Sequence, residues 1–329
     1  YFSAFSARPV EPLLWGLGFL VLCIVVVVRG VSQGIEKVSK VLMPLLFLLL
    51  AGLVVYSVTR PGAGEGLRFL FGIDPARLSG DTLVGALGQA FFSLSVGMGI
   101  MVTYGSYVPK SENLAKSAGW ICALDTLVAV MAALAIVPVV MITQGEEGLG
   151  MGGGFAFISL PAMFAELPGG RFFGTAFFAL LFLAALTSAI SILESLVAFL
   201  TEEFHLSRAR AAIGLSAPMA LLSAGYSLSQ SAGRGIDLPW FDFKNGLQML
   251  PMNAVMEKFT DNLMIPLGAL CFCLFVGWVW GTKAAGQEIA GEHGLRRMQK
   301  PWAFAVRFLA PLVIVVILYF TLGMGEGLS

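Results

Sequence analysis

A long apolar stretch, residues 87–107, is interrupted near its middle by serines and glycines. These residues are Ser93, Ser95, Gly97 and Gly99, and Met98 lies between the two glycines. A glycine inside a helix costs about 1 kcal/mol relative to alanine, and backbone groups freed by a break must find partners in lipid. A membrane span broken at its middle beside hydroxyl groups is typical of a helix that holds a solute or an ion. The alternative is a kinked helix whose glycines only let a neighbouring helix pack closely.

Two carboxylates lie inside other apolar stretches. Asp125 lies well inside residues 117–143, and Glu194 lies toward the end of residues 171–200. A charge at the centre of a bilayer costs at least about 2.5 kcal/mol, so each carboxylate requires a partner. Asp125 therefore suggests a cation ligand or a proton carrier, unless it is an acid bonded to a neighbouring helix. Glu194 has a simpler structural explanation as the acceptor for backbone groups freed by the break in residues 87–107.

A third group of oxygen atoms follows one face of the stretch that contains Glu194. The carbonyl of Ala184 and the hydroxyls of Thr187 and Ser188 lie about one helical turn apart. Hard oxygen ligands at this spacing suit Na⁺, by the reasoning that applies to other hard cations. The alternative is that both hydroxyls only bond to carbonyls one turn back, as serine and threonine do in membrane helices.

The composition places these groups in a membrane. Hydrophobic residues make up 57% of the chain and charged residues only 12%, against about 25% charged residues in soluble domains. The chain is therefore predicted to be an all-α, polytopic membrane protein surrounded by lipid. The formal net charge is zero, so nothing indicates a nucleic-acid partner. The four cysteines lie in apolar runs and are predicted to be small apolar residues rather than disulfides or metal ligands.

The elements that must position these groups are eight predicted spans. Their approximate bounds are 12–28, 38–58, 87–107, 117–143, 171–200, 211–228, 259–280 and 301–322. Polar loops are predicted for residues 59–81, 230–258 and 283–300. Residues 155–167 are too short to cross and are predicted to form a hairpin or an interfacial helix. Lysine and arginine cluster most densely in the loops after the first, third, fifth and seventh spans, so these loops are predicted to be cytoplasmic.

An intramembrane enzyme is a competing class of function. It would need a nucleophile with a base, or a metal site. The two histidines, His205 and His293, lie in predicted loops, and no two acids share a helix face. The chain is therefore predicted not to be an enzyme.

Four segments carry a family resemblance that extends over nearly the whole chain. They are RGVSQGIEKVSKVLMP, GQAFFSLSVGMGIMVTYGSY, LPAMFAELPGG and AALTSAISILE. In order and spacing they resemble the neurotransmitter:sodium symporter family, and most closely its bacterial amino-acid transporters. The resemblance implies sodium-coupled symport of a hydrophobic or neutral amino acid by alternating access, in the cell (inner) membrane.

The family fold consists of two inverted repeats of five helices, followed by one or two further helices. The resemblance implies that residues 1–329 form one transporter domain that corresponds to the fourth to eleventh family helices. Residues 12–59 would end the first repeat, residues 84–282 would form the second, and residues 301–323 would be an additional helix. In the family the first helix supplies much of the ion and substrate sites. An alternative is therefore that this chain is a transport-incompetent part of such a symporter.

The resemblance also implies two Na⁺ sites. Ser93 and Asp125 are expected at the first site, and Ala184, Thr187 and Ser188 at the second. Asp125 stands where many members have asparagine as a sodium ligand. A carboxylate there would also supply the negative charge that other members take from chloride, so chloride is not expected to be required.

The substrate site and the gates are implied in the same way. The expected substrate-binding residues are Phe92, Ser95, Gly97, Met98, Gly99, Ser188 and Ile192. Met98 stands where the family often has phenylalanine, and a methionine implies a roomier apolar pocket. The expected gating residues are Gly34, Pro44, Gln89 and Glu257. Gly34 and Pro44 match a family helix that unwinds toward the cytoplasm, and Glu257 stands where an aspartate closes the outer gate.

Overall fold

The computed structural model describes residues 2–72, 78–145, 157, 160–166, 168–230, 235–243, 246–290 and 299–322. Within these residues, seven helical segments are long and apolar enough to cross a membrane: 11–28, 36–58, 114–143, 170–203, 208–229, 252–279 and 299–321. The remaining predicted span consists of two shorter helices, α5 (Gly80–Ser93) and α6 (Ile100–Tyr107). The prediction of a polytopic α-helical membrane protein is confirmed, with each predicted span at its expected place.

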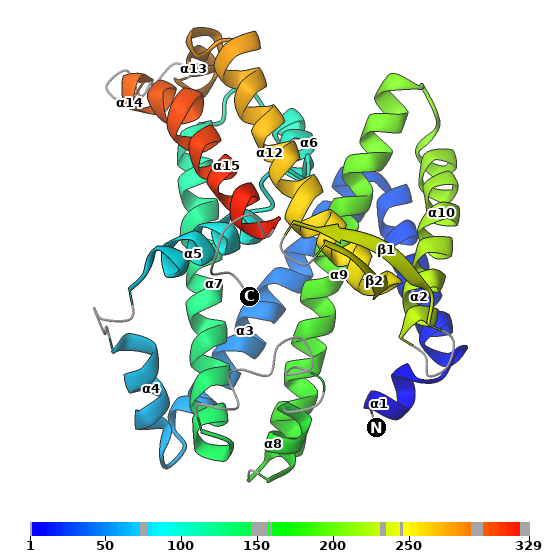
Figure 1. Cartoon of the computed structure of the whole chain (residues 1–329), viewed down its shortest axis with the longest axis vertical. Helices are drawn as coiled ribbons and strands as arrows, with labels where there is room; N and C mark the ends of the chain where they lie inside the picture. The colour runs from blue at the N-terminus through cyan, green and yellow to red at the C-terminus, as the bar shows by residue number, and fades with distance from the viewer. Residues whose placement is uncertain are drawn as a thin grey trace.

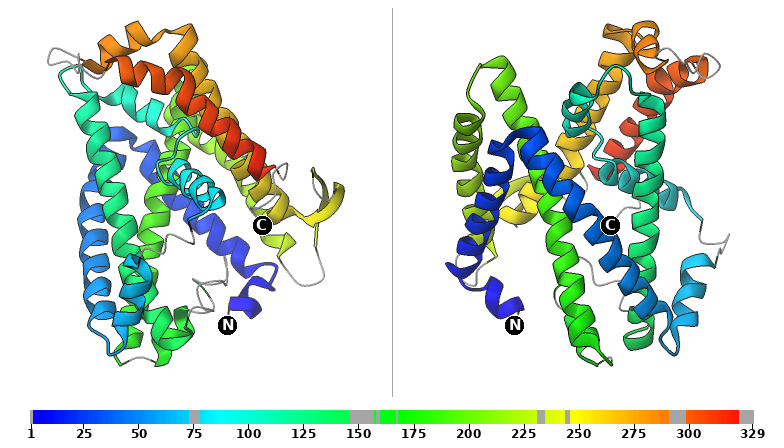
Figure 2. Two further views of the ribbon diagram at one scale, coloured as in Figure 1. Left: turned by 60° about the vertical axis from the view of Figure 1, so that its left-hand side comes forward. Right: turned by 180° about the vertical axis from the view of Figure 1, so that it is seen from behind.

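The longest helix, α9 (Gly170–Glu203), connects two groups of helices (Figures 1 and 2). On one side it packs against α2 (Glu11–Val28) and α10 (Arg208–Ser229). This contact buries an apolar cluster that includes Cys23, Val27, Ile190, Leu193 and Ala212. All four cysteines of the chain are free, as the sequence predicts.

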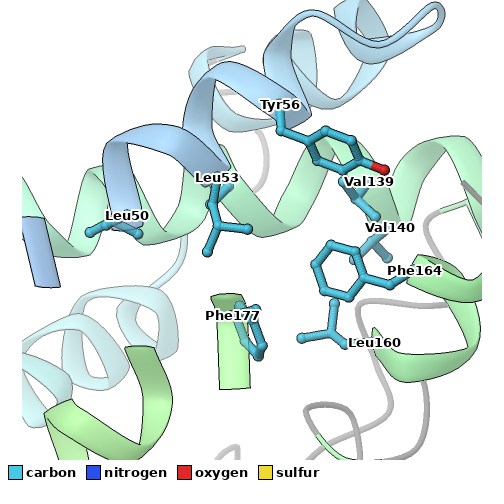
Figure 3. Close-up of a cluster of buried hydrophobic side chains, with 9 residues drawn as sticks. Leu50, Leu53, Tyr56, Val139, Val140, Leu160, Phe164 and Phe177 are labelled. Carbon is cyan, nitrogen blue, oxygen red and sulfur yellow. The ribbon is translucent and has the colours of Figure 1, made fainter. Parts of the chain in front are cut away.

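On its other side α9 packs against α3 (Glu36–Val58), which also lies along α7 (Leu114–Thr143). A second apolar cluster joins these helices to α8 (Leu160–Glu166) (Figure 3). Its members are Leu50, Leu53, Tyr56, Ala135, Val139, Val140, Leu160, Phe164 and Phe177. The short helix α4 (Ala63–Phe71) completes this end of the molecule by packing on α7.

The third group consists of α5 and the two C-terminal spans. One span runs through α11 (Met252–Glu257), η6 (Lys258–Met264), α12 (Ile265–Leu274) and η7 (Phe275–Val279). The other runs through α14 (Gln299–Phe304), η8 (Ala305–Leu309) and α15 (Ala310–Thr321). The η segments are π-helical turns, which are rare and are frequently found at functional sites. Two of them meet where Arg307 Nε donates to the Gly277 carbonyl at 2.8 Å.

Three segments predicted to be polar loops contain helices or strands, so these predictions were wrong in part. Residues 230–258 contain an antiparallel hairpin, β1 (Asp237–Asp242) and β2 (Gly246–Pro251), which projects from the bundle (Figure 2). Burial alternates along both strands, a period-2 signal that is easily missed in so short a segment. Residues 59–81 contain α4 and the start of α5, and residues 283–300 contain most of α13 (Thr282–Ala290).

The helix α1 (Phe2–Ser6) precedes α2, and a π-helical turn, η1 (Val31–Ile35), joins α2 to α3. Within the predicted interfacial segment the structure has the helix α8, while most of residues 151–159 lie outside the described residues.

Candidate functional site

The break between α5 and α6 is real and has an unusual backbone. The residues between the two helices include Ser95 at φ 53°, Gly97 at φ 94° and Gly99 at φ 77°. All three lie in the left-handed region, which glycine adopts freely and serine does not. A non-glycine residue held there costs on the order of 1–3 kcal/mol, and such residues cluster at functional sites.

The broken segment rests on the backbone of α12. A Cβ atom on Gly97 would lie 2.2 Å from the Ile265 carbonyl oxygen and 2.9 Å from the Ala269 nitrogen. In return, a Cβ atom on Gly268 would lie 2.3 Å from the Gly97 carbonyl oxygen. Gly97 therefore serves close packing on α12 as well as the helix break; whether the break also holds a solute or an ion stays a prediction. Sequence reasoning missed Gly268 and Ala269, although two adjacent small residues in an apolar span are a recognisable signal.

The structure brings together Ser93 and Asp125, the two residues predicted for the first ion site. Ser93, the last residue of α5, donates its hydroxyl to both carboxylate oxygens of Asp125, at 2.8 and 2.9 Å. Asp125 lies eleven residues after Leu114, the first residue of α7, which places it about 16 Å along that helix. Within the described part of the chain no lysine or arginine forms an ion pair with Asp125. The site therefore presents an oxygen-rich negative charge without a protein cation.

The predicted second ion site lies on α9. The Thr187 hydroxyl donates to the Ala184 carbonyl at 2.9 Å, and the Ser191 hydroxyl donates to the Thr187 carbonyl at 3.0 Å. The Thr187 bond is the one that the simpler alternative expects, in which a hydroxyl satisfies a carbonyl one turn back, and Ser191 bonds in the same way. They also hold the predicted ligand oxygens of Ala184 and Thr187 close to one another. Tyr104 ties this helix to α6, because its hydroxyl donates to Ser191 Oγ at 2.8 Å.

A single cavity of about 350 Å³ joins the broken helix to α9. Seven of the predicted site residues line it: Phe92, Ser93, Ser95, Met98, Thr187, Ser188 and Ile192. Five further lining residues were not predicted: Met43, Ile100, Met101, Tyr104 and Ser191. Most of these lie within a turn of a predicted residue, so helical spacing from the serines could have found them. The cavity has apolar walls with hydroxyl groups, as expected for a site that takes a small amphipathic solute.

Glu194 does not accept backbone groups from the helix break, so that expectation was wrong. Its side chain is completely buried and accepts a hydrogen bond from the Tyr107 hydroxyl at 2.7 Å. Arg208, at the start of α10, donates to its other oxygen and also donates to the Val27 carbonyl at 3.1 Å. The explanation is that a buried carboxylate is satisfied best by a cation, and the chain supplies one fourteen residues later.

The predicted gating residues are dispersed. Gly34 lies in η1, where a Cβ atom would come within 2.1 Å of the Val26 carbonyl oxygen. Pro44 lies inside the continuous helix α3, so the segment predicted to unwind is helical in this conformation. Glu257 accepts a hydrogen bond from the Tyr226 hydroxyl at 2.6 Å.

Gln89 lies apart from these three residues. It lines a second cavity of about 340 Å³ between α5 and the C-terminal spans, together with Asp261 and Asn262.

The groups at this site can bind a cation and a polar solute. Its polar groups are hydroxyls, carbonyls and one carboxylate, which suit a hard cation and the polar end of a solute. Among the described residues no cluster of three or more histidine, cysteine, aspartate or glutamate side chains forms a metal site.

Comparison with known proteins identifies the family. The profile of the Sodium:neurotransmitter symporter family matches residues 12–325, and the chain belongs to this family. An uncharacterized sodium-dependent transporter, YhdH of Bacillus subtilis, is 33% identical over 98% of this chain and 69% of its own length. An uncharacterized sodium-dependent transporter of Haemophilus influenzae is 32% identical over 94% of this chain and 65% of its own length.

A solved structure has the same fold. The crystal structure of MhsT in complex with L-phenylalanine superimposes with a TM-score of 0.83 at 37% sequence identity, over 98% of this chain and 70% of that chain. The chain thus spans about two thirds of the length of these relatives. It is a multi-pass membrane protein of a sodium-dependent transporter family, and its bacterial relatives are consistent with the inner membrane.

Proposed function

We propose that this chain forms part of a symporter that uses Na⁺ to carry a hydrophobic or neutral amino acid across the membrane. The observation that supports this most is the cavity of about 350 Å³ between the broken helix and α9. Seven residues singled out from sequence line that one space, although they come from segments about ninety residues apart. The structural relative MhsT was solved with L-phenylalanine, which is an amino acid with an apolar side chain.

The walls of the cavity fit such a substrate. Met43, Phe92, Met98 and Ile192 offer apolar surface to a side chain, while the α-amino and α-carboxylate groups require hydrogen-bonding partners. Gly97 and Gly99 have positive φ angles that interrupt the helix beside the cavity, and backbone groups of this break would bind the polar end of the substrate.

Two Na⁺ ions would bind beside the substrate. Ser93 and Asp125 would hold the first, and Ala184, Thr187 and Ser188 would hold the second. The Asp125 carboxylate would supply the negative charge of the first site, so transport would need no chloride. Two charges that move down a potential of about 100 mV contribute about 4.6 kcal/mol, which is enough to drive accumulation.

Alternating access would arise because Na⁺ and substrate bind one conformation more tightly than the other. Na⁺ and substrate join the α5–α6 break to α7 and α9, so they favour the conformation in which these elements are close. Gating would involve Gln89 and Glu257 on one side of the site. On the other side the segment from Gly34 to Pro44 would unwind to release the second Na⁺, because Pro44 cannot donate a helical hydrogen bond.

The test is a screen of amino-acid binding to the complete purified protein, with Na⁺ and with K⁺ in its place. We expect saturable binding of an apolar amino acid that is lost in K⁺ and unchanged when chloride is replaced by gluconate. Ser93→Ala should raise the Na⁺ concentration required for half-maximal binding. Ser195→Ala is the matched control, since Ser195 is half-buried, does not line the cavity and bonds only to its own helix at Ile192. Binding that is equal in Na⁺ and K⁺ would overturn the proposal.

A further inference from the structure

A separate cavity of about 390 Å³ lies where the first turns of α7 meet α13 and α14. Its lining is apolar except for the amide of Gln299, and the argument depends on Ala115, Ala118, Gly286, Ile289 and Trp302. This volume lies within the range of about 300–1,000 Å³ that is usual for small-molecule sites. No residue of the proposed substrate site lines it.

Small residues create this cavity. Ala115 and Ala118 leave the α7 side of the cavity open, and Gly286 leaves the α13 side open. Gly286 also lets α13 approach α14 closely, because a Cβ atom there would lie 3.0 Å from Gln299 Nε2. The three helices are therefore held together above a space that their own side chains do not fill.

The cavity lies at a membrane boundary. The helices α13 and α14 occupy one end of the molecule, opposite α4 and α8 (Figure 1). Each lining helix begins or ends there: α7 and α14 start new spans, and α13 links two spans. Trp302 lies in the first turns of its span, where tryptophan is enriched at the headgroup level of a bilayer. The charge distribution predicts that this boundary is the cytoplasmic one.

Each of the three helices carries an exposed lysine close in sequence to a lining residue. Lys116 lies between the lining residues Ala115 and Ala118, Lys283 lies three residues before Gly286, and Lys300 follows Gln299. None of these lysines forms an ion pair within the described part of the chain. Among the described residues, the acids closest in sequence to these lysines are Glu112 and Glu288, both exposed, so lysines outnumber acids by three to two there.

We propose that this cavity binds an anionic phospholipid of the adjoining leaflet. One acyl chain fills the apolar space between α7, α13 and α14, and the phosphate lies among Lys116, Lys283 and Lys300. An apolar cavity that opens at a bilayer boundary is filled by lipid chains, and basic pockets between membrane helices select anionic headgroups. The combination of an apolar space with three cations on three elements distinguishes this place from the general lipid-exposed surface.

The test is native mass spectrometry of the complete protein, purified in detergent and titrated separately with phosphatidylglycerol and with zwitterionic phosphatidylethanolamine. We expect one phosphatidylglycerol to bind at least tenfold more tightly than phosphatidylethanolamine. The triple variant Lys116→Gln/Lys283→Gln/Lys300→Gln should lose that preference. Arg210→Gln is the control, because Arg210 is an exposed cation on the same predicted side of the membrane but lies in α10, away from this cavity.

Filling the cavity tests the acyl-chain site independently. Ala118→Phe, and Ala115→Leu as a second variant in case the first does not fold, should remove the tightly bound lipid although Lys116, Lys283 and Lys300 remain. Three results would overturn the proposal: equal binding of the two lipids, unchanged selectivity in the triple variant, or no bound lipid because another segment of the protein occupies the space.

Discussion

Ser93 and Asp125 lie thirty-two positions apart in the sequence, yet the Ser93 hydroxyl lies within 2.8 Å and 2.9 Å of the two oxygens of the Asp125 carboxylate. The contact joins the end of α5, where the helix breaks, to the middle of α7. The hydroxyl donates its single proton to the acid, so its lone pairs remain available for a cation. A Na⁺ ion at this place would be bound by both helices. Its affinity would therefore depend on the distance between the end of α5 and α7.

Asp125→Asn should raise the Na⁺ concentration for half-maximal binding at least tenfold, because the amide keeps an oxygen ligand but removes the charge. Asp125→Ala should abolish Na⁺-dependent uptake. The measurement is uptake by the complete protein in proteoliposomes across a Na⁺ series. Thr126→Val is the control, since Thr126 bonds only within its own helix to Cys122. Unchanged Na⁺ dependence in both Asp125 variants would remove Asp125 from the ion site.

The same variants test the prediction about chloride. If the Asp125 carboxylate supplies the negative charge of the site, then the wild-type protein should transport equally in chloride and in gluconate. Asp125→Asn should transport better in chloride, because an added anion replaces the lost charge. Wild-type transport that stops in gluconate would contradict this prediction.

Met98→Phe should narrow the cavity between the break and α9, because a rigid ring replaces a flexible thioether. We expect binding of tryptophan to weaken at least fivefold relative to alanine, measured by competition in Na⁺ buffer. Met249→Phe is the control, since Met249 is exposed on the β hairpin, away from the cavity. An unchanged preference between tryptophan and alanine would show that Met98 does not limit substrate size.

Gly97→Ala should destabilise the protein far more than Gly99→Ala. Both residues have positive φ angles, so each substitution carries backbone strain of about 1 kcal/mol or more. Only at Gly97 would the new methyl group also collide with the α12 backbone, whereas no heavy atom lies within 4 Å of a Cβ on Gly99. Thermal unfolding in detergent should show a lower midpoint for Gly97→Ala. Equal midpoints would mean that the α5–α6 break and α12 move apart easily.

Much of this arrangement follows from sequence because lipid imposes strong constraints. An apolar run of about twenty residues must be a helix, so eight spans and the break at residues 94–99 could be located. The contact of Gly97 with Gly268 could not be predicted, because it depends on how two helices cross. The same limit explains Glu194, because its partner Arg208 lies between two predicted spans and approaches only when α10 folds back along α9. The hairpin β1–β2 was missed because strand signals in short polar segments are weak.

Arg208→Ala should be among the most destabilising single substitutions in the chain. The Glu194 side chain has no exposed surface and the Arg208 side chain is 27% exposed, so removal of the cation leaves a buried carboxylate uncompensated. Such a loss costs about 3–5 kcal/mol in the free energy of unfolding. Because the arginine is partly exposed, we expect a loss of about 3 kcal/mol. The Val27 carbonyl at the end of α2 loses its side-chain donor in the same variant.

The matched control for Arg208→Ala is Lys40→Ala. Lys40 pairs with Glu36 at 2.6 Å, but both side chains are largely exposed, so its loss should cost at most about 1 kcal/mol. Glu194→Gln should restore much of the stability when combined with Arg208→Ala, because the neutral amide can still accept the Tyr107 hydroxyl. The comparison of unfolding midpoints for the two single variants and the double variant measures the coupling directly. If Arg208→Ala shifts the midpoint no more than Lys40→Ala, then water reaches Glu194 and the buried pair is not what holds α9 to α10.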